Sequence, residues 1–553
     1  MIPTARQAFA GIAFSALLCA SLFAQSTAPP AATPPPTFQI ADIHPSPYSF
    51  YSTYARTATQ GTDRFLVRQA TLLDMISIAY SLDQDHVLGG PTWLDFDRYE
   101  VTARQPPKTP PETSRLMLRA LLADRFKLVV HNDTRPMPAQ ILTVGKATTK
   151  MKPAADTTVP SQCQFHPPAT PPTPDAPPIT SYSFTCRNIT MAQFVNNIPR
   201  SSSGPAIADQ TGLNGAWDFD ITYTMLPSRT GFDLANDLDK QLGLKLTVGQ
   251  SAQPVLIVDS VNETPTTNSP RLAELLPPPP TPAFDVAVVK PTDPSGPREM
   301  QIRFNGSGQV NISGATLQAL IGEAYDISGA GIADIPGFLS KQRWDIVGKI
   351  AQDDYPKSPN GMPIVSFDDI KLMLRSLLEE RFGMKTHFED RPTDAWVLSA
   401  SGSSKLKKTA DPNARTSCDD RPPLGEKDPR ATDPIRSRLM ICKNVTMTQF
   451  AHELEPFALD YIKSPVLDAT HIEGSYDLTL NWSTSRVARG VETVDGRAVT
   501  KTDTDSASDP TAPTGAISLP DAIAHQLGLK LELQKLSVPM LILDHIEPTP
   551  TEN

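Results

Sequence analysis

The chain has 553 residues, a formal net charge of −10 at pH 7 and 56 prolines, with 39% apolar and 7% aromatic residues. This length predicts two to four domains, and a proline content roughly twice the usual share predicts stiff, solvated linkers or insert loops. The negative charge and the lack of a Lys/Arg block argue against nonspecific nucleic-acid binding, so we expect no nucleic-acid partner.

The N-terminus has the pattern of a processing signal. Arg6 precedes an apolar run from Ala8 to Ala24 that is short for a membrane-spanning helix, and a Pro/Thr-rich tract follows. We predict a cleaved signal peptide over 1–24 and an exported protein, periplasmic or secreted. A lipoprotein anchored at Cys19, whose preceding residues fit a lipobox poorly, and an uncleaved anchor are the alternatives. We expect no transmembrane segment after signal removal.

Blocks of similar sequence occur twice along the chain in the same order. QLGLKL is present at 241–246 and 526–531, and LMLRALLADRF at 116–126 matches LMLRSLLEERF at 372–382. Many such matches in one order indicate a tandem duplication. The predicted segments are a signal peptide (1–24), a Pro/Thr-rich linker (25–37), a first unit (38–262), a Pro-rich linker (263–283), a second unit (284–547) with a mobile insert at about 484–517, and a tail (548–553).

Strand and helix patterns alternate within each unit. In the second unit, 367–382 has the pattern of an amphipathic helix with an acidic start. We interpret 384–390 and 395–401 as two adjacent strands that pair with each other, and 539–547 as a separate final strand. Short connections between helices and antiparallel-compatible strands predict an α+β fold, in which each unit places mixed helices on a largely antiparallel sheet.

The cysteines predict one disulfide in each unit. Cys163 and Cys186 in the first unit occupy the same relative positions as Cys418 and Cys442 in the second. In an exported chain this pattern predicts two intra-unit disulfides, each contributing on the order of 3 kcal/mol by loop entropy. Metal ligation and a catalytic thiol are the alternatives, but the spacing is far from C-x-x-C. We expect no metal and no cofactor.

Polar residues shared by both copies are the weak catalytic candidates. His131 and His387 are equivalent, and each is followed by a carboxylate at +2 and an arginine at +4. A histidine beside a carboxylate can serve as a general base. On a strand these residues share one face, so a surface row of charges that pair across strands explains them as well, and we favour that explanation. Asp259 and Asp544 interrupt apolar strands near their ends, where a carboxylate can also be catalytic.

Other shared polar residues have simpler explanations. Arg125 and Arg381 end a long helix, where a cation complements the helix dipole. Asp218 and Asp477 lie within alternating strands and are expected to face solvent. The sequence contains no G-x-S-x-G, H-E-x-x-H, P-loop or dinucleotide signature.

The quoted blocks also carry a family resemblance. FDVAVVKP, ATLQALIGEAY, LLxxRFxxxxHxxxRP, NVTMTQF, GSYDLTLNW, QLGLKL and LILDHIE together resemble the soil-associated TIGR03435 family, also described as DUF3738, over nearly all of the mature chain and twice over. The resemblance implies an exported protein of a kind abundant in Acidobacteria, usually with one copy of the unit. The family has no established activity to carry over. A fainter similarity to the short N-terminal domains of secretins and TonB-dependent receptors suggests protein binding.

These observations favour a non-enzymatic, exported binding or scaffold protein of the cell envelope or secretome that acts through two repeated units. Its partner would be a protein or glycan of the envelope, and duplication would raise avidity. A secreted or periplasmic hydrolase with an unrecognised active site and a partner of an envelope sensor are the alternatives. A deep pocket around the His131 or His387 position, with Asp259 or Asp544 beside it, would favour chemistry. Exposed sheet edges or a repeated groove would favour binding.

Overall fold

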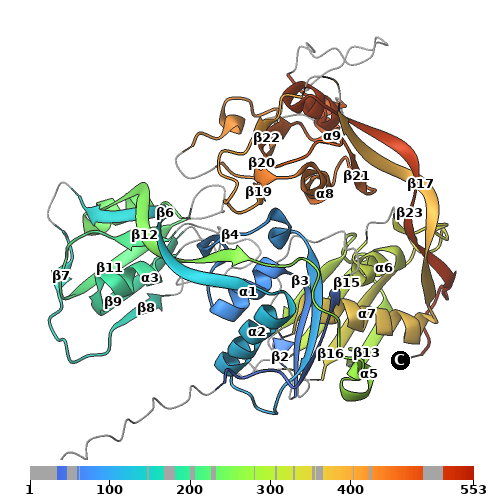
Figure 1. Cartoon of the computed structure of the whole chain (residues 1–553), viewed down its shortest axis with the longest axis horizontal. Helices are drawn as coiled ribbons and strands as arrows, with labels where there is room; N and C mark the ends of the chain where they lie inside the picture. The colour runs from blue at the N-terminus through green and yellow to red at the C-terminus, as the bar shows by residue number, and fades with distance from the viewer. Residues whose placement is uncertain are drawn as a thin grey trace, which may run out of the picture.

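A computed structural model provides the three-dimensional structure of the chain (Figure 1). It describes residues 34–552 except 47–58, 61–62, 146–148, 167–180, 200–205, 226–231, 279–280, 306–307, 328–330, 352–354, 356–364, 401, 403, 423–425 and 490–514. The predicted signal peptide, most of the 25–37 linker and most of the predicted insert therefore lie outside the described residues. Among the described residues, no helix is long and apolar enough to cross a membrane.

The first unit folds into two lobes. Its N-terminal lobe, which we call N1, has an antiparallel sheet of order β1-β5-β3-β2, with helices packed on one face around a core that includes Phe65 and Leu118. The elements are β1 (Ile40–Pro45), β2 (Thr59–Gln60), β3 (Arg64–Thr71), α1 (Leu72–Tyr80), η1 (Gln84–His86), β4 (Val87–Gly89), η2 (Thr92–Asp95), β5 (Arg98–Arg104) and α2 (Pro111–Arg125).

The C-terminal lobe of the first unit, C1, has a second antiparallel sheet of order β7-β11-β9-β8 and its own core around Phe194 and Tyr223. Its elements are β7 (Lys152–Pro153), β8 (Gln162–His166), β9 (Ser181–Thr190), α3 (Met191–Asn197), β10 (Ile207–Asp209), β11 (Ala216–Thr224), α4 (Leu234–Asp237) and the π-helical turn η3 (Leu238–Leu242).

A long antiparallel ribbon joins the two lobes. It consists of β6 (Val129–Val144) and β12 (Leu244–Ser260), with β10 and β4 added in parallel at its edges. Leu256 at one end packs in the N1 core, whereas Leu142 and Leu244 at the other end pack in the C1 core. Figure 1 shows this ribbon passing from the projecting C1 lobe to N1. The lobes thus share two strands.

The second unit repeats this plan with lobes N2 and C2 and the ribbon β17–β23 (Figure 1). The linker contributes α5 (Leu272–Leu275). N2 and the ribbon contain β13 (Phe284–Pro291), β14 (Gln301–Asn305), β15 (Gln309–Thr316), α6 (Leu317–Tyr325), β16 (Arg343–Ile350), α7 (Phe367–Phe382), β17 (Lys385–Ala400) and β23 (Leu529–His545). C2 contains β18 (Lys407–Lys408), β19 (Ser417–Asp419), η6 (Pro429–Ala431), β20 (Arg438–Val445), α8 (Met447–Phe457), β21 (Val466–Ala469), β22 (Tyr476–Trp482), α9 (Ser485–Ala488), α10 (Leu519–Ala522) and η7 (Ile523–Leu527).

Local sequence explains where equivalent helices begin. Thr71 and Thr316 cap α1 and α6 by accepting a hydrogen bond from the backbone three residues later. Thr190 and Thr446 form capping boxes with a glutamine at the third helical position. The α+β fold and the two tandem units are therefore confirmed. The disulfides Cys163–Cys186 and Cys418–Cys442 are confirmed as well, each between directly paired strands.

The prediction for the strands of the second ribbon was wrong. The segments 384–390 and 395–401 do not pair with each other, because β17 is one continuous strand of 16 residues. It pairs along its length with the 17-residue β23, which also absorbs the predicted separate strand at 539–547. Pro392 and Pro539 lie inside the ribbon without interrupting it, because a strand with a free edge can hold a proline without losing a ladder hydrogen bond.

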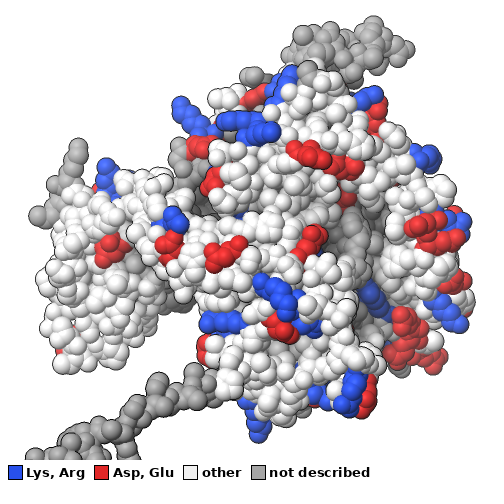
Figure 2. Space-filling view, in the orientation of Figure 1, with Lys and Arg blue, Asp and Glu red and all other residues white. Residues whose placement is uncertain are grey.

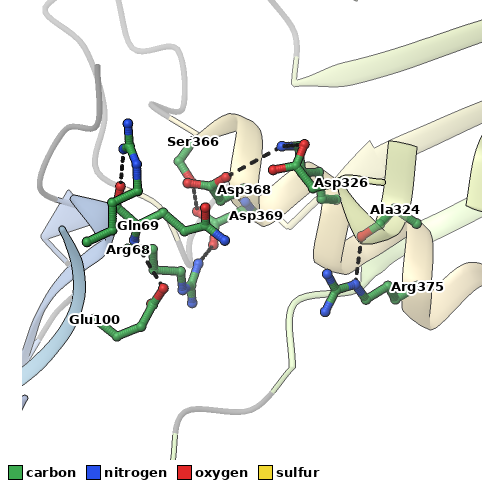
Figure 3. Close-up of polar contacts among 11 residues, drawn as sticks. Arg68, Gln69, Glu100, Ala324, Asp326, Ser366, Asp368, Asp369 and Arg375 are labelled. Atoms are coloured by element: carbon green, nitrogen blue, oxygen red, sulfur yellow. Dashed lines mark hydrogen bonds and ion pairs between the residues drawn. The ribbon is translucent and has the colours of Figure 1, made fainter. Parts of the chain in front are cut away.

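The two units contact each other at two joints. At the first, Arg68 of β3 in N1 forms an ion pair with Asp369 near the start of α7, whose N-cap is Ser366 (Figure 3). At the second, C2 packs against the end of the first ribbon and η2. Gly89 N donates to Asn413 O (3.3 Å), and Gln449 Nε2 donates to Thr92 O (3.0 Å).

Buried charges complete the second joint. Arg415 donates to the backbone oxygen of Gly89 and lies 3.5 Å from Asp95, with side chains 12% and 7% exposed. The Phe96 and His452 rings meet edge to face at 4.9 Å. Burial raises the pKa of Asp95 to about 6 and lowers the pKa of His452 to about 4. The tandem is therefore held by specific side chains in addition to its linker.

Candidate functional site

The structure brings two of the predicted residues of the first unit together. His131 lies near the start of β6, and Asp259 lies near the end of β12, where the strand register shifts between Val258 and Ser260. Such a bulge turns a side chain out of its regular direction. As a result, His131 Nδ1 lies 2.9 Å from both carboxylate oxygens of Asp259.

The second unit forms the same pair. His387 lies near the start of β17, and Asp544 lies at the register shift between Leu543 and His545 of β23. Nδ1 of His387 lies 2.9 Å from Asp544 Oδ2. The bulge, the residue types and the distance are thus the same in both copies.

Each His–Asp pair continues into a short row of charges. In the first unit Asp133 pairs with Arg135 at 2.8 Å, and in the second Glu389 pairs with Arg391 at 2.9 Å. We call these two groups the ribbon strips: His131, Asp133, Arg135 and Asp259 in the first unit, and His387, Glu389, Arg391 and Asp544 in the second.

The Asp–Arg pair of the first strip and the Glu–Arg pair of the second run along one strand rather than across the ribbon. The residues opposite His131 and His387 on the partner strands are Ile257 and Ile542, and Val255 is opposite Asp133. Within the strips, charges therefore pair across the strands at the His–Asp bulges, and farther along the second ribbon the directly opposite Asp394 and Lys535 form another cross-strand pair at 3.0 Å. Figure 2 shows charges of both signs close together along the side formed by β17 and β23.

Both strips are open to solvent. The side chains of His131 and Asp259 are 53% and 41% exposed, and those of His387 and Asp544 are 49% and 46% exposed. The hydrogen bond to Asp544, with a smaller contribution from Glu389, raises the pKa of His387 and favours the imidazolium form. A ring held at Nδ1 leaves Nε2 for hydrogen bonding to a ligand, although in the second unit Nε2 of His387 also lies 3.8 Å from Glu389.

One cavity among the described residues is lined by residues of neither strip. This cavity of about 500 Å³ lies between β1, α2 and the linker, and its lining includes Gln39, Leu121, Arg125 and Thr266. This cavity therefore does not supply the deep pocket around His131 or His387 that would have favoured chemistry. One of the residues that line this cavity is Arg125, an arginine that both units share.

Arg125 and Arg381 do more than complement a helix dipole. Arg125 donates to Thr266 O and, with Nη1, to Ala41 O, and so fastens the segment after the first ribbon to N1. Arg381 Nη2 donates to Thr551 O at 2.6 Å in the same way. The sequence signal for this latch was present, since ETPTTN after the first unit resembles EPTPTEN after the second.

Asp218 and Asp477, which we expected to face solvent, are partly exposed and also accept backbone hydrogen bonds. Asp218 accepts hydrogen bonds from the backbone of Asn188 and Ala155, and Asp477 accepts them from Asn444 and Ala410. The bond from the Asn188 backbone contributes most to lowering the pKa of Asp218. These bonds hold the asparagine ahead of each capped helix in a left-handed backbone conformation, with φ of 50° at Asn188 and 52° at Asn444. Their role is structural.

The architecture defines a class of protein before any comparison does: a tandem of two α+β units, each with two lobes on a ribbon, a disulfide and an exposed His–Asp pair. The model of the family described as a protein of unknown function, DUF3738, matches residues 73–261 and again residues 318–546. The chain therefore belongs to the DUF3738 family and carries its unit twice. No curated protein and no solved structure matches the chain.

Proposed function

We propose that this protein is a non-enzymatic, exported binding or scaffold protein of the cell envelope or secretome, and that the two ribbon strips are its contact surfaces. The observation that supports this most is the recurrence of an exposed His–Asp pair at 2.9 Å on the same bulge of both units. An exposed ion pair adds little to folding, so stability alone is a weak reason for building it twice. A protein or glycan of the envelope is the partner class that we propose.

Export is part of the same proposal. Two disulfides form within the chain, and disulfides persist in oxidising compartments such as the periplasm or the extracellular space. The signal-peptide pattern over 1–24 supports export from the sequence side.

The openness of the strips favours binding over catalysis. Catalytic groups gain strength where water is excluded, and each of these pairs is about half exposed. Charges of both signs within a few residues instead suit a partner surface that carries complementary charges and hydrogen-bonding groups.

Two strips on one chain suit a repetitive or dimeric partner. The joints between the units involve buried side chains, so the two strips are held at a defined separation. Two sites at a separation that matches the partner raise the effective affinity without any new contact.

A hydrolase remains the second candidate because of one observation. A carboxylate on Nδ1 orients a histidine as a general base with Nε2 free to take a proton. This candidate requires a substrate large enough to shield the exposed pair, such as a polymer lying along the ribbon.

The test is affinity capture by the immobilised chain from Gln25 onward, exposed to native envelope and secreted extract, with retained species identified by mass spectrometry. His131→Ala and His387→Ala would be compared singly and together, with Lys530→Gln as a control on the same ribbon. Lys530 pairs with Glu532 at 2.8 Å and lies outside both strips. We expect a species that the wild type and the control retain, each single variant retains weakly, and the double variant loses.

Retention that is unchanged in the double variant would refute the strips as contact surfaces. Turnover of a polymeric substrate that is lost in the same double variant would replace the binding proposal with the hydrolase. If the binding free energy lost in the double variant equals the sum of the losses in the two single variants, bivalence is refuted. Bivalent binding makes the loss in the double variant larger than that sum.

A further inference from the structure

The C1 sheet ends in a strand that has a neighbour on one side only among the described residues. This strand is β8 (Gln162–His166), which pairs with β9 and is last in the order β7-β11-β9-β8. A free edge presents unpaired backbone groups that pair readily with another strand. Natural proteins therefore usually guard such edges with charged side chains, prolines or very short strands.

The other edge strands of the C1 and C2 sheets carry these guards, and β8 does not. β7 is Lys152–Pro153, β18 is Lys407–Lys408, and β19 has three residues and ends at Asp419. In contrast, β8 has five residues, none of which is Lys, Arg, Asp, Glu or Pro. Of the four edge strands described in these two sheets, β8 is thus the one open to strand addition.

The disulfide shows which backbone groups of β8 point to the free edge. Opposite residues of an antiparallel pair have Cα atoms about 4.5 Å apart where they exchange no backbone hydrogen bonds and about 5.5 Å apart where they do. Cys163 and Cys186 are directly opposite, and their Cα atoms are 4.0 Å apart. Cys163, and with it Phe165 two residues on, therefore directs its N–H and C=O groups away from β9.

Phe165 adds an apolar contact to this edge. Its side chain lies on the same face as the disulfide and is 44% exposed. The ring packs against Phe184 and Tyr182 of β9, with centroid distances of 5.4 and 6.0 Å. A strand added beside β8 would cover the exposed part of the ring with its own opposite side chain.

We propose that β8 is a dimerisation strand that pairs antiparallel with β8 of a second copy of this chain, across a two-fold axis at Gln164. In this register Cys163 is opposite the second copy's Phe165, and Phe165 is opposite the second copy's Cys163. Each of these pairs exchanges two backbone hydrogen bonds through the groups that point to the free edge. The two C1 sheets then form one continuous sheet.

A second copy suits this edge because two-fold symmetry places the central residue against itself. Gln164 is uncharged and meets its copy without repulsion, and amide side chains can hydrogen bond to each other. Each Phe165 ring would lie over the other copy's disulfide and within reach of the other Phe165 ring. Figure 1 shows C1 projecting from the other lobes, so it can meet another C1 lobe.

The second unit lacks this edge. Its residues Asp419, Asp420 and Arg421 correspond to Gln164, Phe165 and His166, because Cys418 corresponds to Cys163. Self-pairing of that edge would bring like charges together. One such edge per chain, paired with itself, gives a closed dimer rather than a filament. This inference is independent of the ribbon strips, and the dimer would present the strips of both copies.

The first test is sedimentation velocity of the chain from Gln25 onward at micromolar to submillimolar concentrations. A pairing of five residues is smaller than a standard interface, so we expect a reversible monomer–dimer equilibrium. Phe165→Asp and Gln164→Asp introduce the carboxylates of the second unit and should each weaken dimerisation at least about tenfold. Gln250→Asp is the matched control, because it makes the same change at an exposed position of β12 and should leave the equilibrium unchanged.

The second test uses the two-fold axis directly. Gln164→Cys would place two sulfurs opposite each other in the geometry of the native Cys163–Cys186 pair, so mild oxidation should give a covalent dimer on a non-reducing gel. Gln162→Cys is the control on the same face of β8. In the proposed register it lies about 13 Å along the strand from its own copy, beyond the reach of a disulfide.

A wild type that stays monomeric at every concentration, with no covalent dimer of Gln164→Cys, would refute the proposal. So would a dimer that Phe165→Asp and Gln164→Asp leave intact, because its interface would lie elsewhere. Equal cross-linking of Gln162→Cys and Gln164→Cys would refute the register. If the wild type is monomeric and Phe165→Asp instead abolishes retention of a protein from envelope extract, the occupant of the edge is a strand of another protein and the dimer is refuted.

Discussion

The two units agree inside their lobes and differ where they touch each other. The arginine latch, the disulfide, the capped helices and the His–Asp pair recur in both. At the second joint, by contrast, the charged and aromatic contacts occur in one copy only, although Gln449, which also contacts N1 there, has Gln193 as its counterpart. Asp95 and Phe96 correspond to Ser340 and Lys341 of the second unit, and Arg415 and His452 correspond to Pro160 and Asn196 of the first.

This difference separates two kinds of interaction. Residues that recur stabilise a single unit and are needed wherever the unit folds. Residues that differ build one particular joint, in which C2 contacts N1. The reciprocal pairing of C1 with N2 would place Pro160 against Ser340, and neither residue could replace the buried Arg415–Asp95 pair. The joint is thus directional, which explains why C1 projects away from the other lobes in Figure 1.

The largest expected effect comes from Arg415→Ala at the joint. Removing the guanidinium leaves Asp95 buried without its ion pair and Gly89 O without a donor, which costs about 4 kcal/mol of joint stability. We expect the radius of gyration from small-angle scattering to increase, while both lobes of each unit keep their circular dichroism.

The matched control for that experiment is Arg271→Ala, which removes an exposed arginine paired with Glu274. It should leave the scattering curve unchanged. If the Arg415→Ala variant is as compact as the wild type, the two units are held together by the Arg68 contact and the linker, and the second joint is not needed for it.

A smaller, pH-dependent effect should distinguish His452 from its counterpart in the first unit. Burial, with a smaller contribution from Arg98, lowers the pKa of His452 from 6.5 to about 4. The folded protein therefore holds the neutral ring, and this contribution to stability is complete above pH 6.5 and is lost as the pH falls toward 4. At pH 5 the loss amounts to about 2 kcal/mol.

Substitution by asparagine, the residue that the first unit has at this position, removes the titration. The difference in free energy of unfolding between the wild type and His452→Asn, from urea denaturation, should shift by about 2 kcal/mol between pH 7 and pH 5. Burial raises the pKa of Asp95 to about 6 and that of Glu453 to about 7, so their contributions are lost as the pH rises and oppose that of His452. Taking the difference between the two proteins isolates the histidine. A constant difference would contradict the buried neutral ring.

The sequence predicted what repeats and missed what the copies do not share. The α+β class, the duplication and the disulfide pairing all follow from matched blocks, because a repeated pattern is visible within one chain. The joint was invisible because Arg415 and Asp95 are far apart in sequence and have no counterpart to draw attention to them. The continuous second ribbon was missed because a proline such as Pro392 is unfavourable inside a strand unless its nitrogen lies on a free edge, and the strand pairing that provides this edge cannot be read from the sequence.

The candidate site was predictable in its residues but not in its geometry. Periodicity places His131 and Asp133 on one face of a strand, and that placement is what the structure has. The approach of Asp259 depends on a register shift, and a one-residue bulge leaves no mark in the hydrophobic pattern.

The smallest effect, about 1 kcal/mol for each unit, is expected for the latch and tests the recurring side of the comparison. Arg125→Ala removes hydrogen bonds to the backbone oxygens of Thr266 and buried Ala41, and Arg381→Ala removes those to Thr551 and half-buried Ala287. Because the latch has the same geometry in both units, the two variants should lower the free energy of unfolding by similar amounts. Denaturation monitored by fluorescence would measure both. A loss confined to Arg125→Ala would mean that the linker and α5, which follow only the first unit, give its latch a strength that the second copy lacks.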